Sequence, residues 1–137
     1  MQHYSIGTPG KPWGDEEKAQ WKAQQHIQRS YNDEVLSKFE NIVPEGFKLT
    51  QYGALPYDEA RYPLYAIIPD TIDSKKPSAL VTGGVHGYET SGVQGALQFI
   101  ESKLSDFSDA FNIIVVPCVS PWGYETINRW NPMALDP

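Results

Sequence analysis

A histidine and a glutamate stand three positions apart in the segment His86-Gly87-Tyr88-Glu89, directly after an apolar run and directly before a helical pattern. A neutral imidazole and a carboxylate are two of the three protein ligands that a hydrolytic zinc ion uses, with water in the fourth position. The residue types and their position therefore make His86 and Glu89 candidate ligands of a metal ion such as Zn²⁺. No third ligand can be matched elsewhere in the sequence.

Glycines surround this pair. Gly83, Gly84 and Gly87 remove side chains from the bend, which allows a tight backbone and is expected to leave space beside the ligands. Without that setting, the pair would be read as a turn histidine and a glutamate that complements the helix dipole. A glycine bend before a helix can also hold phosphate, but the dinucleotide and Walker patterns are absent and Glu89 would repel an anion.

The elements that must position the pair follow from hydrophobic periodicity. Residues 15–30 are expected to form a helix that opens with acidic residues, and a second helix is expected from Asn32 or Asp33 to the stop at Pro44. A third helix is expected at 90–102. Strands are predicted at 47–52, 62–68, 78–83 and 111–116, and the segment that begins with Ser120 reads as turns.

This order of elements predicts an α/β fold. The strand–helix–strand unit implies a parallel, right-handed crossover, and the two earlier strands imply a hairpin-like antiparallel pair. We therefore expect a mixed sheet with helices on both faces, in a domain at 31–137 preceded by an arm and helix at 1–30. His86 and Ser120 each follow the carboxyl end of a neighbouring strand, so both should lie on the rim where ligands gather.

Composition excludes some classes of partner. The 137 residues carry a formal net charge of −6, which disfavours binding to nucleic acid or to an anionic membrane surface. The N-terminus has no basic start followed by an apolar stretch, so no secretory signal is visible and a cytoplasmic location is expected. Cys118 is the single cysteine and is expected to be a small buried hydrophobic residue.

The segment Lys76–Glu89 resembles the zinc-binding segment of the metallocarboxypeptidases and, more widely, of the superfamily that includes succinylglutamate desuccinylase and aspartoacylase. Residues 31–39 resemble the helix that opens the catalytic domain, and residues 52–66 resemble the strands before the zinc loop. Ser120-Pro121-Trp122-Gly123 is similar to an Asn-Pro-Asp/Asn-Gly segment of the family. The resemblance spans residues 31–137 and corresponds to the N-terminal part of the catalytic domain.

The resemblance implies that zinc binds His86 and Glu89 and that Arg129 polarises the scissile carbonyl, although Arg129 alone reads equally well as a surface arginine. It implies a peptide substrate with a free C-terminal carboxylate. The family's second zinc histidine, its glutamate base and an Asn-Arg pair have no match, and His3 and His26 precede the domain core. We therefore expect the C-terminal half of the domain to be a partner, and the chain alone to be inactive.

Two alternatives remain open. A carboxypeptidase is the first choice, but the His-x-x-Glu segment is also compatible with an N-acyl amino acid amidohydrolase of the succinylglutamate desuccinylase and aspartoacylase type. A non-catalytic fragment or binding module that retains the rim without its chemistry is the alternative outside the enzymes.

Overall fold

The computed structural model describes residues 5–137, so the first four residues of the expected arm, with His3, lie outside the described part. Four strands form one sheet in the order β1-β2-β4-β3. β1 (Phe47–Ala54) pairs antiparallel with β2 (Pro63–Pro69), which pairs antiparallel with β4 (Asn112–Val116). β4 pairs parallel with β3 (Ser78–Thr82). The mixed sheet confirms the α/β class, and β3 forms one edge of the sheet.

Helix α4 (Thr90–Ser102) makes the crossover from β3 to β4 and packs its apolar side on the sheet. Its inward residues Val93 and Ile100 are at most 1% exposed, and they contact a core that includes the fully buried Ile67 and Val115. Burial of each such side chain contributes about 1.5–3 kcal/mol. At 13 residues α4 has the predicted bounds. None of the helices in residues 5–137 is long and apolar enough to cross a membrane.

The N-terminal helices are shorter than the sequence predicted. α1 (Asp15–Ala23) ends seven residues before Ser30, and residues 24–30 form a non-helical connection. The next helix is capped by Ser30, whose Oγ accepts from the backbone N–H of Asp33 at 3.1 Å, rather than by Asn32 or Asp33. It is divided into three short pieces: α2 (Tyr31–Glu34), η1 (Leu36–Lys38) and α3 (Phe39–Ile42).

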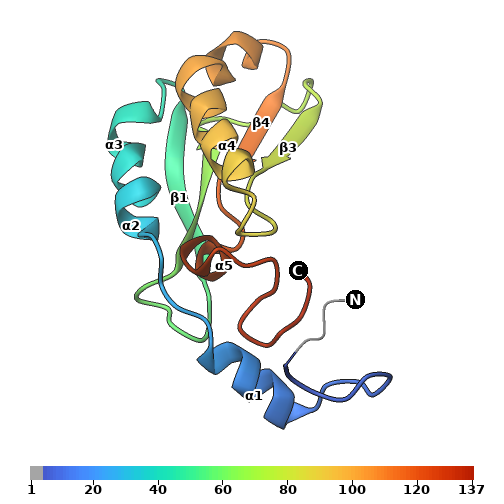
Figure 1. Ribbon diagram of the computed structural model, residues 1–137. Coiled ribbons are helices and arrows are strands. Elements are labelled where there is room, and N and C mark those ends of the chain that lie inside the picture. The colour runs from blue at the N-terminus through green and yellow to red at the C-terminus, as the bar shows by residue number, and fades with distance from the viewer. Residues whose placement is uncertain (1–4) are drawn as a thin grey trace.

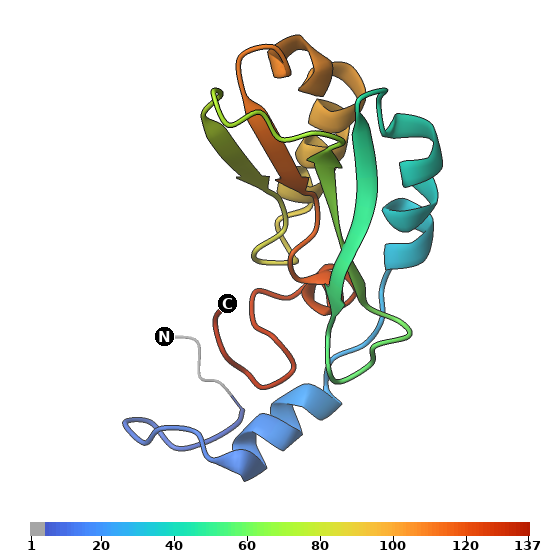
Figure 2. The same cartoon turned by 180° about the vertical axis from the view of Figure 1, so that it is seen from behind.

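The helices α2, α3 and α4 lie together on one face of the sheet, as the two opposite views show (Figures 1 and 2). Helices were expected on both faces. In the described part of the chain the opposite face has none, and Leu80 of β3 is 66% exposed there. The physical reason is that α4 is the single long crossover, and α3 packs beside it on the same face.

A further helix, α5 (Pro121–Thr126), occupies the segment that was expected to be turns. Pro121 stands at the first helical position, where a missing N–H costs nothing, and all six residues are buried. The sequence pattern did not predict this helix, because Pro and Gly within six residues are typical of turns. A short 3₁₀ helix, η2 (Leu104–Phe107), follows α4.

Candidate metal centre

The glycine bend runs alongside the segment that leaves β4. Backbone N–H groups join Gly83 to the carbonyl of Val116 at 2.8 Å and Ser120 to the carbonyl of Gly84 at 2.9 Å. The Ser120 hydroxyl donates to the carbonyl of Val85 at 2.6 Å. The structure thus places His86 and Ser120 on one rim, at the carboxyl ends of β3 and β4, as the sequence predicted.

The glycines in this bend allow other backbone segments to pack closely against it, and they do not leave room for a ligand. A Cβ on Gly83 would lie 2.5 Å from the carbonyl oxygen of Gly92, and one on Gly87 would lie 1.9 Å from the carbonyl carbon of Gly123. Gly84 has φ +61°, a left-handed conformation that favours glycine. The expected open space beside the ligands is therefore filled by α4 and α5, which hold the bend from two sides.

His86 and Glu89 face each other. The Nδ1 atom of His86 lies 3.2 Å from Oε1 of Glu89. Glu89 occupies the N-cap position of α4, yet its carboxylate makes no capping hydrogen bond to the helix. The side chain of His86 is 19% exposed and that of Glu89 is 51% exposed, so solvent reaches the pair mainly from the side of Glu89. The two candidate ligands are therefore in direct contact, and the carboxylate of Glu89 does not cap the helix.

Asp136 completes a row of three side chains. Its Oδ1 lies 2.9 Å from Nε2 of His86, across 50 positions of sequence. A turn built on Asn131 returns the chain to the rim: Oδ1 of Asn131 accepts from the N–H groups of Met133 and Leu135. Sequence reasoning attached no role to Asp136, because the contact depends on this turn and no local pattern marks it.

The ring of His86 lies between two hydrogen-bond acceptors. Carboxylates accept hydrogen bonds and a neutral imidazole has one N–H, so it can donate to Asp136 or to Glu89 but not to both. If Nε2 donates to Asp136, the lone pair of Nδ1 faces a carboxylate oxygen of Glu89. Two such acceptors attract only through a cation between them, either a second proton or a metal ion.

The donor set fits zinc. Two ligands at about 2.1 Å from a tetrahedral ion lie about 3.4 Å apart, close to the 3.2 Å between Nδ1 and Oε1. A histidine ligand commonly donates its other N–H to a carboxylate, the part that Asp136 can play. Within residues 5–137, no group of three His, Cys, Asp or Glu side chains is arranged as a full metal-ligand set.

Arg129 lies next to this row through Asp136. Its Nε and one terminal nitrogen each lie 2.9 Å from Oδ2 of Asp136, the oxygen that His86 does not use. Hydrogen bonds with Tyr88 and then Asp136 raise the pKa of Arg129. The hydrogen bond from Arg129, followed by that from His86, lowers the pKa of Asp136. The structure therefore brings the predicted residues His86, Glu89 and Arg129 together, with Asp136 as their link.

Several solved structures share this arrangement of strands and helices. A candidate metallopeptidase from Shewanella amazonensis SB2B superposes with a TM-score of 0.63 at 22% identity, over 83% of this chain and 45% of its own. A candidate metallopeptidase from Shewanella denitrificans OS217 superposes with a TM-score of 0.61 at 24% identity, over 74% of this chain and 37% of its own. Bovine thrombin-activatable fibrinolysis inhibitor, in complex with tick carboxypeptidase inhibitor, gives 0.57 at 22% identity, over 81% and 38%.

The chain has the fold of carboxypeptidase-like metallopeptidases. It spans less than half the length of each of these three structures. No protein-family profile matches the sequence, and no curated protein matches it. The fold resemblance agrees with the family that the segment Lys76–Glu89 resembles.

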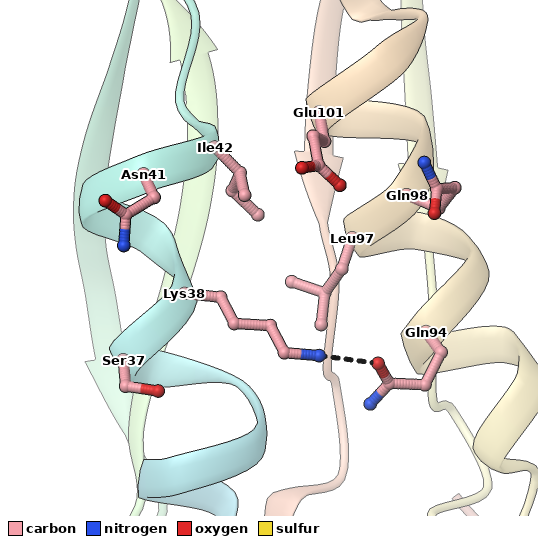
Figure 3. Close-up of a pocket in the computed structure, with 8 residues that line it drawn as sticks. All are labelled: Ser37, Lys38, Asn41, Ile42, Gln94, Leu97, Gln98 and Glu101. Carbon is pink, nitrogen blue, oxygen red and sulfur yellow. Dashed lines mark hydrogen bonds between the residues drawn. The ribbon is translucent and has the colours of Figure 1, made fainter.

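A separate cavity of about 450 Å³ lies on the helical face of this metallopeptidase-like fold, between η1–α3 and α4 (Figure 3). The Lys38 ammonium donates to Oε1 of Gln94 across it at 2.8 Å. His86, Glu89 and Arg129 do not line this cavity, so it is distinct from the rim.

Two residues that sequence reasoning passed over contribute to the architecture of the rim. Arg29 was assigned to the interior of the first helix, but it lies in the connection after α1 and donates to the loop of His86. Glu125 lies buried in α5, and its Oε2 forms an ion pair with Nε of Arg61 at 2.6 Å. A buried carboxylate within an apparent turn gives no signal in the sequence alone.

Proposed function

We propose that His86 and Glu89 hold a zinc ion and that this chain supplies part of a zinc-dependent hydrolase, a carboxypeptidase that removes C-terminal amino acids from peptides. The observation that carries the proposal is the row Glu89–His86–Asp136, in which the two ring nitrogens face two carboxylates. Such a row requires a cation at Nδ1 when Nε2 donates to Asp136.

Each side chain has a distinct task in this proposal. Asp136 accepts from Nε2 of His86, which fixes the tautomer that presents Nδ1 as a ligand. Glu89 provides the second ligand atom. Bound zinc would acidify a water molecule and polarise the scissile carbonyl. Arg129 is anchored beside His86 by Asp136, and its fixed positive charge would stabilise the oxyanion that develops there.

Catalysis needs more groups than these. A third ligand and a general base must come from additional polypeptide, which we propose is the C-terminal half of the domain. The uncovered sheet face, with Leu80 66% exposed on edge strand β3, supports a partner at this position. The chain alone should therefore show negligible peptidase activity. Robust zinc-dependent release of C-terminal amino acids by residues 1–137 would contradict this assignment.

Metal binding tests the core of the proposal. A longer form that includes the additional polypeptide, loaded with Zn²⁺ and dialysed, should retain zinc, whereas its His86→Ala and Glu89→Gln variants should lose it. His26→Ala and Glu101→Gln are matched controls, since both of these residues are exposed and lie outside the row. The controls should retain zinc as the wild type does. Absence of zinc from the wild type, with no effect of His86→Ala, would instead favour the non-catalytic binding module.

The amidohydrolase alternative requires a different assay. A longer form that includes the additional polypeptide should release C-terminal residues from peptides if it is a carboxypeptidase. Preference for N-acyl amino acids over peptides would instead assign it to the succinylglutamate desuccinylase and aspartoacylase type. Both substrate classes present a free carboxylate beside an amide, which is why the rim alone fits either one.

A further inference from the structure

Arg29 lies in the connection between α1 and α2 and donates to three separate acceptors. Its Nε donates to the carbonyl of Tyr124 at 2.6 Å, Nη1 to the hydroxyl of Thr90 at 2.6 Å, and Nη2 to the carbonyl of Gly87 at 3.1 Å. All three nitrogens of one guanidinium are therefore used. Arg29 joins the N-terminal connection to α5, to the glycine bend and to the start of α4.

Two of these acceptors bracket the candidate ligands. Gly87 directly follows His86, and Thr90 directly follows Glu89. The guanidinium thus donates hydrogen bonds to the backbone one residue after His86 and to the side chain one residue after Glu89. A change in either contact would alter the separation of Nδ1 and Oε1, because the two ligand side chains extend from this short loop.

Tyr124, whose carbonyl accepts from Arg29, also supports the guanidinium with its ring. The guanidinium stacks over the Tyr124 ring with its central carbon 3.7 Å from the ring centroid. Tyr124 is fully buried, and its hydroxyl donates to Glu34 at 2.6 Å and accepts from Gln94 at 2.9 Å. Gln94 is also the residue that accepts a hydrogen bond from Lys38 across the cavity in Figure 3. The ring beneath Arg29 is therefore fixed at its hydroxyl end by two side chains.

We infer that Arg29 is a positioning residue for the zinc site, one that fixes the loop carrying His86 and Glu89 in ligand geometry. This inference rests on the zinc function proposed above. A lysine could not replace it, since one ammonium cannot reach three acceptors in the fixed directions of a guanidinium fork. Supporting residues of this kind commonly change metal affinity 10–100-fold when they are altered.

The test compares Arg29→Lys, which keeps the charge and loses the fork, with wild type. Zn²⁺ affinity is measured on the longer form that carries the third ligand, by competition with a chromophoric chelator, and the visible spectrum of the Co²⁺-saturated protein reports ligand geometry. We expect Arg29→Lys to weaken Zn²⁺ binding about tenfold or more and to alter the Co²⁺ bands. A loss of general stability alone would leave the spectrum of the saturated chain unchanged.

Three further variants separate positioning from folding. Thr90→Val removes one acceptor of the fork in an exposed position and should weaken Zn²⁺ binding, while Thr90→Ser keeps the hydroxyl and should not. Arg61→Lys weakens the other arginine contact to α5, through Glu125, without touching the loop. It should leave Zn²⁺ affinity unchanged even where it lowers the melting temperature.

The outcomes distinguish the two proposals. If wild type binds Zn²⁺ and Arg29→Lys and Thr90→Val bind it equally well with the same Co²⁺ spectrum, the positioning role is overturned and the zinc function stands. If wild type binds no Zn²⁺, both proposals fail together. Should Arg29→Lys fail to fold, the pair Thr90→Val and Thr90→Ser decides the question, since equal affinities for these two would overturn the role.

Discussion

Gly87 and Gly123 pack backbone against backbone, so closely that a Cβ on Gly87 would lie 1.9 Å from the carbonyl carbon of Gly123. This contact joins the loop of His86 to helix α5. Neither neighbour can move by rotating a side chain, because both surfaces are main chain. The position of the candidate ligand therefore depends on the absence of two side chains that lie 36 positions apart in the sequence.

Gly87→Ala should destabilise the chain by about 2 kcal/mol or more, since the backbone itself must shift, and it should also weaken Zn²⁺ binding. Gly95→Ala is the matched control: its Cβ would meet nothing within 4 Å, and it lies within α4. That control should stabilise the chain by about 0.5–1 kcal/mol. Urea unfolding measures both variants. Equal stabilities would show that the loop and α5 are not in contact in solution.

Asp136→Asn should lower Zn²⁺ affinity about 10–100-fold while leaving the fold intact. The amide oxygen can still accept from Nε2 of His86, but it no longer carries the charge that increases the basicity of the imidazole and pairs with Arg129. Asp109→Asn is the control, because Asp109 is exposed and lies before β4, at the opposite end of that strand from the rim. Competition titration provides the measurement, and equal affinities for the two variants would exclude Asp136 from the site.

Arg61→Gln should cost about 2 kcal/mol of unfolding free energy, because it leaves the carboxylate of Glu125 buried without its cation. Glu125 is 3% exposed and also accepts from the Tyr62 hydroxyl at 2.9 Å and the Tyr31 N–H at 2.8 Å. Lys103→Gln breaks an ion pair whose members are 61% and 57% exposed, and it should change stability by less than about 0.5 kcal/mol. Denaturant unfolding of both variants tests the contrast, and a similar cost for the two would argue against a buried pair.

Cys118 should resist alkylation in the folded chain. Burial raises the pKa of its thiol to about 12, and the side chain is 2% exposed. The reactive thiolate is therefore scarce at pH 8, and the reagent has little access to it. Iodoacetamide should modify the native chain at least about a hundredfold more slowly than the chain in urea. Similar rates in both conditions would mean that the end of β4 opens readily.

The same thiol makes stability depend on pH. Because the folded state raises the pKa, the contribution of Cys118 to stability is present below its ordinary value of 9.0 and is lost as pH rises toward about 12. Melting temperature should therefore fall across this range. Cys118→Ala should show a smaller fall between pH 9 and pH 12 than wild type, and an identical profile would assign the loss to other groups.

The sequence by itself determined the local elements of this protein. The periodicity at 90–102 predicted α4 to the residue, and alternating or continuous apolar patterns located all four strands within two residues of their ends. It also marked His86 and Glu89 as candidate ligands, because both lie in one short segment at the end of a strand. These features depend on residues within a few positions of one another, so the sequence alone can predict them without the tertiary structure.

The tertiary structure decided the rest. Asp136 meets His86 only after the turn at Asn131, and Arg29 meets Gly87 only because α1 ends at Ala23 and releases the connection. The edge position of β3 and the helical state of residues 121–126 depend likewise on packing between distant segments. Contacts of this kind are selected by closure of the whole chain, in which burial and hydrogen bonding across 50 or more residues outweigh local preference.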